Sequence, residues 1–81
     1  MPAVTISCLA RGVLTSSTVA AETFADLSEV IIFEMDALGD IPPGTLITIH
    51  ALTPYVPAII GTRQRLSRAL KTQTIDQLFE A

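Results

Sequence analysis

Four of the five basic side chains in this 81-residue chain lie within ten residues, in the segment TRQRLSRALK at residues 62–71. Arg65, Arg68 and Lys71 recur every three residues, so on a helix they form one row. Such a row could bind nucleic-acid phosphates, dock on an acidic protein surface, or be the solvent-exposed side of an amphipathic helix. The net charge of −3 and the lack of an accompanying aromatic residue argue against nucleic acid.

Acidic residues are concentrated elsewhere in the chain. Six of the eight lie between residues 22 and 40, so the chain is acidic in its middle and basic near its end. Two copies, or one copy and a similarly charged partner, could pair the acidic segment with the basic one. Complementarity of this kind sets orientation and association rate more than affinity. These acids are Glu22, Asp26, Glu29, Glu34, Asp36 and Asp40.

Metal binding and nucleophilic catalysis have few candidate residues. Glu34, Asp36 and Asp40, with His50, are of the types that bind divalent cations. The expected hairpin, however, places His50 far from Asp36, and we expect solvated carboxylates and no metal. Cys8 lies on the apolar side of its expected strand, where a thiol is a poor nucleophile. The sequence predicts no catalytic residue and no cofactor.

The N-terminal residues suggest one alternative. The stretch MPAVTI opening a strand, with Arg11 near its end, resembles the start of the 4-oxalocrotonate tautomerase family. In that family the initiator methionine is removed and the exposed proline amine is the general base. The resemblance implies that Pro2 would be the base and that Arg11 would bind a carboxylate. The alternative function is a small tautomerase-like enzyme whose site forms between protomers.

The composition points to self-association. Hydrophobic residues make up 49 % of the chain and charged residues only 16 %, against roughly 25 % in typical soluble domains. A small domain has much surface to cover, so apolar surface should stay exposed unless the ten threonines cover it. Exposed apolar patches usually contact a partner.

Several features bear on the compartment. A single cysteine excludes an internal disulfide, and the first residues do not resemble a signal peptide. The longest stretch without Asp, Glu, Lys or Arg, residues 41–62, contains four prolines and does not suit a membrane-spanning helix. We therefore expect a soluble protein of the cytoplasm, or of an intracellular assembly or virion, with no membrane partner.

The expected elements follow from hydrophobic spacing. Residues 3–14, 29–38 and 45–52 are predicted as strands, because their apolar residues alternate or are β-branched. Residues 15–18, TSST, are predicted as a turn, and a short helix is predicted over residues 19–27, capped by Thr18. Residues 39–44, GDIPPG, form the turn that makes the last two strands antiparallel.

The end of the chain is predicted to be helical. Thr53 and Pro54 suit a helix start, and an apolar stripe runs from Tyr55 to Leu70, with Gly61 as the point where the helix could break. A short terminal helix follows, with Thr74 and Gln77 in capping-box spacing. Its apolar side chains require a docking surface, because so short a helix is unstable alone. They are Ile75, Leu78 and Phe79.

Together these elements predict one α+β domain spanning residues 1–81, in β-α-β-β-α order with a short terminal helical turn. Its helices would pack on one face of a three-stranded sheet. Neither outer strand is guarded by lysine, and such edges commonly pair with another copy. The leading interpretation is a non-enzymatic small subunit that forms a homo-oligomer or belongs to a larger assembly. The expected contacts are Arg65, Arg68, Lys71, Ile75, Leu78 and Phe79. A regulatory or nucleic-acid-binding module using the last helix is a further alternative.

Overall fold

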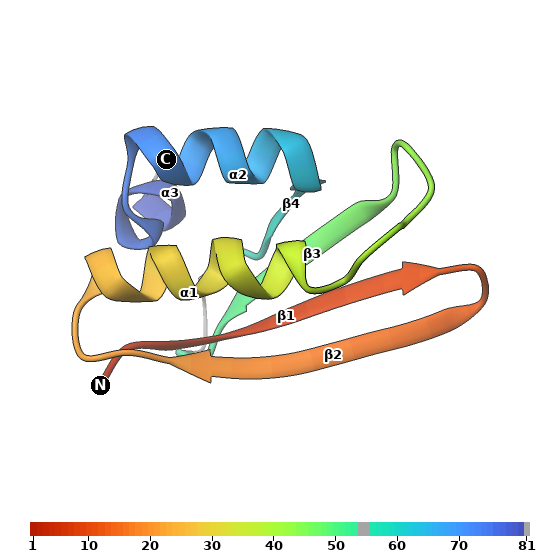
Figure 1. Cartoon of the computed structure of the whole chain (residues 1–81). Helices are drawn as coiled ribbons and strands as arrows, with labels where there is room; N and C mark the ends of the chain where they lie inside the picture. Colours follow the sequence, from red (N-terminus) through yellow and green to blue (C-terminus); the bar gives the residue numbers. More distant parts are fainter. Residues whose placement is uncertain (54–55, 81) are drawn as a thin grey trace.

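The computed structural model describes residues 1–53 and 56–80. Within them the chain forms an antiparallel sheet of four strands in the order β2-β1-β3-β4, with α1, α2 and α3 all on the same side (Figure 1). The α+β class is confirmed, but the expected three strands are four and the element order is β-β-α-β-β-α-α. The strands are β1 (Ala3–Ala10), β2 (Val13–Ala20), β3 (Leu46–Ala51) and β4 (Ile59–Thr62); the helices are α1 (Phe24–Asp36), α2 (Arg63–Thr72) and α3 (Ile75–Glu80).

The predicted single strand at residues 3–14 is wrong, because the chain reverses at Arg11 and Gly12. Both residues have positive φ angles, 54° and 77°, as a tight two-residue hairpin turn requires. Arg-Gly lacks the Asn or Asp that usually marks this turn. Residues 15–18, TSST, expected as a turn, therefore lie in β2. The helix predicted over residues 19–27 begins only at Phe24.

The predicted strand at residues 29–38 is also wrong, since these residues belong mostly to α1. Leu27, Ile31 and Met35 recur at helical spacing and are fully buried. Thr23 caps the helix, its hydroxyl accepting a hydrogen bond from the Asp26 amide at 3.1 Å. The β-branched run within this segment favours a strand locally. Burial of one helical stripe outweighs that preference.

The third predicted strand is confirmed as β3, but the long last helix is interrupted. Ile59 to Thr62 form β4, and α2 starts only after Thr62, whose hydroxyl accepts from the Arg65 amide. Gly61 lies in β4 against Leu66. A Cβ atom added at Gly61 would lie 3.3 Å from the Leu66 side chain. The break that Gly61 suggested therefore occurs. The helix start predicted at Pro54 and Tyr55 lies outside the described residues.

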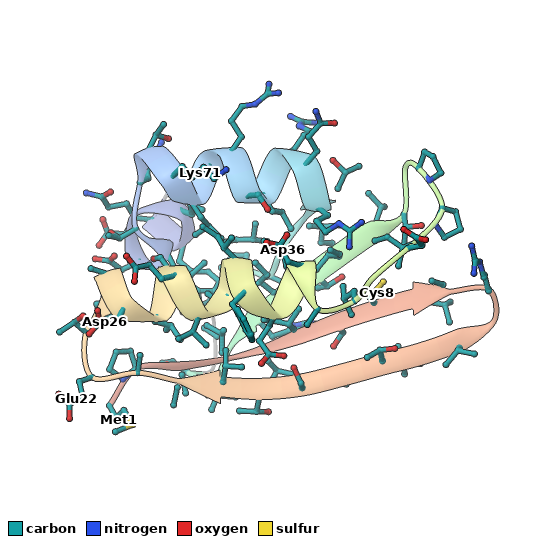
Figure 2. All side chains as sticks on the ribbon, in the orientation of Figure 1. Met1, Cys8, Glu22, Asp26, Asp36 and Lys71 are labelled. Atoms are coloured by element: carbon teal, nitrogen blue, oxygen red, sulfur yellow. The ribbon has the colours of Figure 1, made fainter. Side chains whose placement is uncertain are left out.

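The core lies between the helix layer and one face of the sheet. Val4, Ile6 and Cys8 of β1, with Ile47 and Ile49 of β3, point toward the helices. Figure 2 shows the sulfur of Cys8 on this side of β1. The helices contribute Leu27, Ile31, Met35, Leu66, Leu70 and Ile75.

One buried hydroxyl joins α1 to α3. The Ser28 hydroxyl donates to the Phe24 carbonyl at 2.8 Å and accepts from the Ile75 amide at 2.9 Å. It thereby satisfies an amide in the first turn of α3 that has no partner within the helix. The Thr74 amide donates to the Gln77 side chain at 3.0 Å, as the capping-box spacing predicted, whereas the Thr74 hydroxyl contacts Asp76.

A second contact joins α1 to α2. The Arg63 guanidinium donates to the carbonyls of Met35, at 3.2 Å, and Gly39, at 2.6 Å. Carbonyls at a helix C-terminus lack partners within the helix and carry partial negative charge. Arg63 therefore caps α1 from another element, a role that its place in the basic cluster did not suggest.

Removing the Ser28 hydroxyl should loosen α3. We expect Ser28→Ala to lower the free energy of unfolding by about 1–3 kcal/mol, because the Ile75 amide is left buried without a partner. Urea unfolding measures the loss, and hydrogen exchange should show faster exchange at Ile75. The control Ser67→Ala, in α2, should change stability by less than about 0.5 kcal/mol. Equal effects of the two changes would contradict the linking role of Ser28.

Removing the Arg63 guanidinium should destabilise the end of α1. Arg63→Met keeps the aliphatic stem but loses both hydrogen bonds, and should cost about 1–2 kcal/mol in urea unfolding. Arg68→Met, at an exposed position of the same helix, is the control and should stay within about 0.5 kcal/mol. If both variants match the wild type, Arg63 does not stabilise the fold.

Candidate functional site

The sheet face turned away from the helices is uncovered in the described part of the chain (Figure 1). Strand alternation places every second side chain there. The register aligns them in rows across the strands, because Thr5 pairs with Thr18 and His50, and Ser7 pairs with Ser16 and Thr48. We call this surface the open face. Its members are Ala3, Thr5, Ser7, Leu9, Leu14, Ser16, Thr18, Ala20, Leu46, Thr48, His50, Ile60 and Thr62.

The open face is uncharged apart from the titratable His50 and combines two kinds of side chain. Short hydroxyl residues fill its centre, and the hydroxyls of Thr5 and Thr18 hydrogen-bond at 3.1 Å. Four large aliphatic side chains are also exposed: Ile60 to 61 %, Leu9 to 63 %, Leu14 to 69 % and Leu46 to 57 %. Leu9 and Leu14 are paired across the hairpin. A flat surface of this composition suits contact with another protein surface.

The outer edge of β2 adjoins the open face. This strand has eight residues, VLTSSTVA, with no charged residue, proline or glycine. Natural proteins usually protect such edges with lysine, proline, a bulge or a covering segment. Most residues of β2 are exposed. The other edge strand, β4, has four residues and runs directly into α2.

The six residues predicted as partner contacts divide into two groups. Arg65, Arg68 and Lys71 are exposed on α2, in the helix layer and on the other side of the sheet from the open face. Ile75 is fully buried, and Leu78 and Phe79 are partly buried against the core. The docking surface that the terminal helix required is thus supplied by the chain itself.

The charge polarity of the sequence becomes a local arrangement within the helix layer. Most of the acidic cluster lies on or beside α1, and the basic row lies on α2. These two helices pack against each other (Figure 1). Figure 2 labels Asp26 and Asp36 on α1 and Lys71 on α2. Ionised side chains are therefore concentrated in the helix layer, and none lies on the open face.

The catalytic and metal candidates are dispersed. Cys8 is buried in the core, and His50 is exposed on the open face. Within the described residues, no group of three or more His, Cys, Asp or Glu side chains could hold a metal ion. Pro2 and Arg11 stand at opposite ends of β1, roughly 30 Å apart along the strand, so one copy of the chain does not bring them together.

A cavity of about 440 Å³ opens between the start of β1 and α3. Pro2, Phe24, Leu27 and Phe79 contribute to its walls, and Asp76 also lines it. The walls are mainly apolar, and their polar side chains are Thr53 and the carboxylates of Asp76 and Glu80. Arg11, in the hairpin turn, does not reach it, and the cavity offers shape without recognisable chemistry.

Sequence reasoning did not find the open face. The signal was present in residues 46–50, where Leu46, Thr48 and His50 alternate with the buried Ile47 and Ile49. It was hidden in β2, because the hydroxyl run at residues 15–18 was interpreted as a turn. Only the pairing of β2 with β1 brings the hydroxyl residues into rows.

Comparisons with protein-family models, with curated proteins and with solved structures give no significant match. In the described part of the chain, no helix has the length and apolar character needed to cross a membrane. The function is therefore inferred from the surface of the molecule itself.

Substitutions of the adjacent β3 residues Leu46 and Ile47 test which face of the sheet is covered. Ile47→Thr should cost about 2–4 kcal/mol in urea unfolding, because it puts a hydroxyl and a cavity in the core. Leu46→Thr should cost less than about 1 kcal/mol when measured in dilute solution. A large loss for Leu46→Thr would mean that the open face is covered within a single copy.

Proposed function

We propose that this protein is a non-enzymatic subunit that associates with further copies of itself through the strand side of its fold. The observation that carries the proposal is the open face, which exposes four large aliphatic side chains among hydroxyl residues. In water, exposed apolar area of this kind favours association. Sheets stack face to face about 10 Å apart when small and aliphatic side chains interdigitate.

The distribution of charge favours a second copy as the occupant. Copies with a net charge of −3 repel one another overall. The ionised side chains gather in the helix layer, however, and stacked open faces would hold the two helix layers apart on the outside. Apart from His50, no titratable side chain would be buried between the sheets, so the desolvation cost of charge is small.

The area of the open face sets the expected strength of the contact between copies. From strand spacing and length, one open face has a projected area of roughly 400 Å². Specific stable interfaces bury about 800 Å² on each partner. A contact through one face alone would therefore lie at the small end of the range of specific interfaces, and additional contact surface would strengthen the assembly.

The proposal is tested by native mass. At micromolar concentration the mass should exceed the 8.6 kDa of one chain and should be little affected by salt, because the contact is uncharged. Ser7→Lys, at the centre of the open face, should reduce the mass. The control Gln64→Lys, with the same charge change on exposed α2, should leave it unchanged.

A wild-type monomer at these concentrations would overturn the proposal. Dissociation at high salt would instead favour pairing of the acidic and basic helices, and Arg65→Glu/Arg68→Glu would then abolish assembly. Loss of assembly in that variant, with Ser7→Lys unaffected, would contradict a role for the open face.

A further inference from the structure

The free edge of β2 is the strongest unassigned feature of the fold. The Ala21 amide donates to the Pro2 carbonyl at 3.1 Å, so Pro2 and Ala21 are a hydrogen-bonded pair of the hairpin. This bond shows which of the following β1–β2 residue pairs are also hydrogen-bonded. Such pairs alternate along an antiparallel ladder. The main-chain groups of Val13, Thr15, Ser17 and Val19 therefore face β1. Those of Leu14, Ser16, Thr18 and Ala20 face outward.

We infer that β2 pairs antiparallel with β2 of a second copy, forming one continuous eight-stranded sheet. The inference rests on the proposed self-association and specifies how two copies meet. A two-fold axis perpendicular to the sheet turns each outward donor toward an acceptor of the other copy, so the edge is complementary to itself. No charged side chain, proline or bulge on β2 opposes this pairing.

The alternation of faces restricts the register. Because the two-fold axis is perpendicular to the sheet, each open-face residue must stand opposite an open-face residue of the second copy. One residue of β2 must therefore face the same residue of the second copy, and the axis lies at that residue. Placing it at Ser17 sets Ser16 opposite Thr18 and Leu14 opposite Ala20 of the second copy. All outward groups of β2 then pair, giving about eight main-chain hydrogen bonds, two for each facing pair. A shift in either direction leaves one end unpaired, because it sets Ala20 opposite Gly12 in the turn or Leu14 opposite Glu22 beyond the end of β2.

Edge pairing also enlarges the open face that is available for contact. In the doubled sheet both helix layers lie on the same side, and the two open faces become one surface. Its projected area is roughly 800 Å², twice that of the open face of one copy. Two such dimers could then stack through their open faces, and the edge-paired dimer would be the unit of assembly.

Cysteine cross-linking tests the register. Ser17 would face Ser17 of the second copy as a non-hydrogen-bonded pair with Cα atoms about 4.5 Å apart, within the range that a disulfide spans. Under mild oxidation, Ser17→Cys should form a disulfide-linked dimer of twice the chain mass. The control Thr15→Cys lies on the same face but would stand opposite Val19, and should not link. Buried Cys8, present in both variants and in the wild type, should not link either.

A proline tests the hydrogen bonds. Ser16→Pro removes an outward amide that has no partner among the described residues and leaves the bonds to β1 intact. The dimer loses two hydrogen bonds, one from each copy, so its dissociation constant should rise at least roughly tenfold. Circular dichroism and thermal unfolding of dilute protein should show that the fold persists.

The outcomes separate this inference from the proposed function. An oligomeric wild type with no Ser17→Cys dimer and no effect of Ser16→Pro would overturn edge pairing and leave the open face as the contact. Linking of Ser16→Cys in place of Ser17→Cys would overturn the register. A monomeric wild type would overturn both proposals.

Discussion

All three helices pack on the same face of the sheet, and this one-sided burial is the constraint on which the rest of the structure depends. The chain is long enough for one layer of helices over four strands, and the apolar residues of both layers meet in a single core. The two central strands, β1 and β3, therefore alternate between buried and more exposed side chains, whereas the edge strands β2 and β4 contain no fully buried residue. The open face, the exposed edge and the charged helix layer all follow from this arrangement.

The helix layer holds together through two polar contacts as well as apolar packing. Ser28 joins α1 to the first turn of α3, and Arg63 joins the end of α1 to the start of α2. Ser28 pairs an amide that the start of α3 leaves without a helical partner, and Arg63 adds a hydrogen bond to the Met35 carbonyl, which also accepts from the Leu38 amide. Short helices are unstable alone in water, so these contacts position α3 and the end of α1. The basic cluster thus contains one structural arginine beside the exposed row.

The fold keeps Asp, Glu, Lys and Arg off the open face, although the helix layer also exposes the apolar side chain of Phe33. Ionised groups lie on and around the helices, and the strand side presents hydroxyl and aliphatic groups. Such a molecule can approach its own copies with the strand side while the helix layers stay hydrated and apart. The residues considered for chemistry lie apart in the fold: Cys8 in the core, His50 on the open face, and Pro2 at the cavity beside α3.

The sequence by itself determined the elements whose signals are local. The β-branched residues of 45–52 predicted β3, the capping spacing of Thr74 and Gln77 predicted the start of α3, and the α+β class followed from the mixture of predicted strands and helices. Only the tertiary structure decided α1, where burial of Leu27, Ile31 and Met35 overrides a β-branched run. It also decided β2, whose Arg-Gly turn carries a weak signal and whose hydroxyl residues become a strand through pairing with β1. The open face and its adjoining edge depend on that pairing, which joins residues through space, and the alternation at residues 46–50 indicates only the part of the face that β3 contributes.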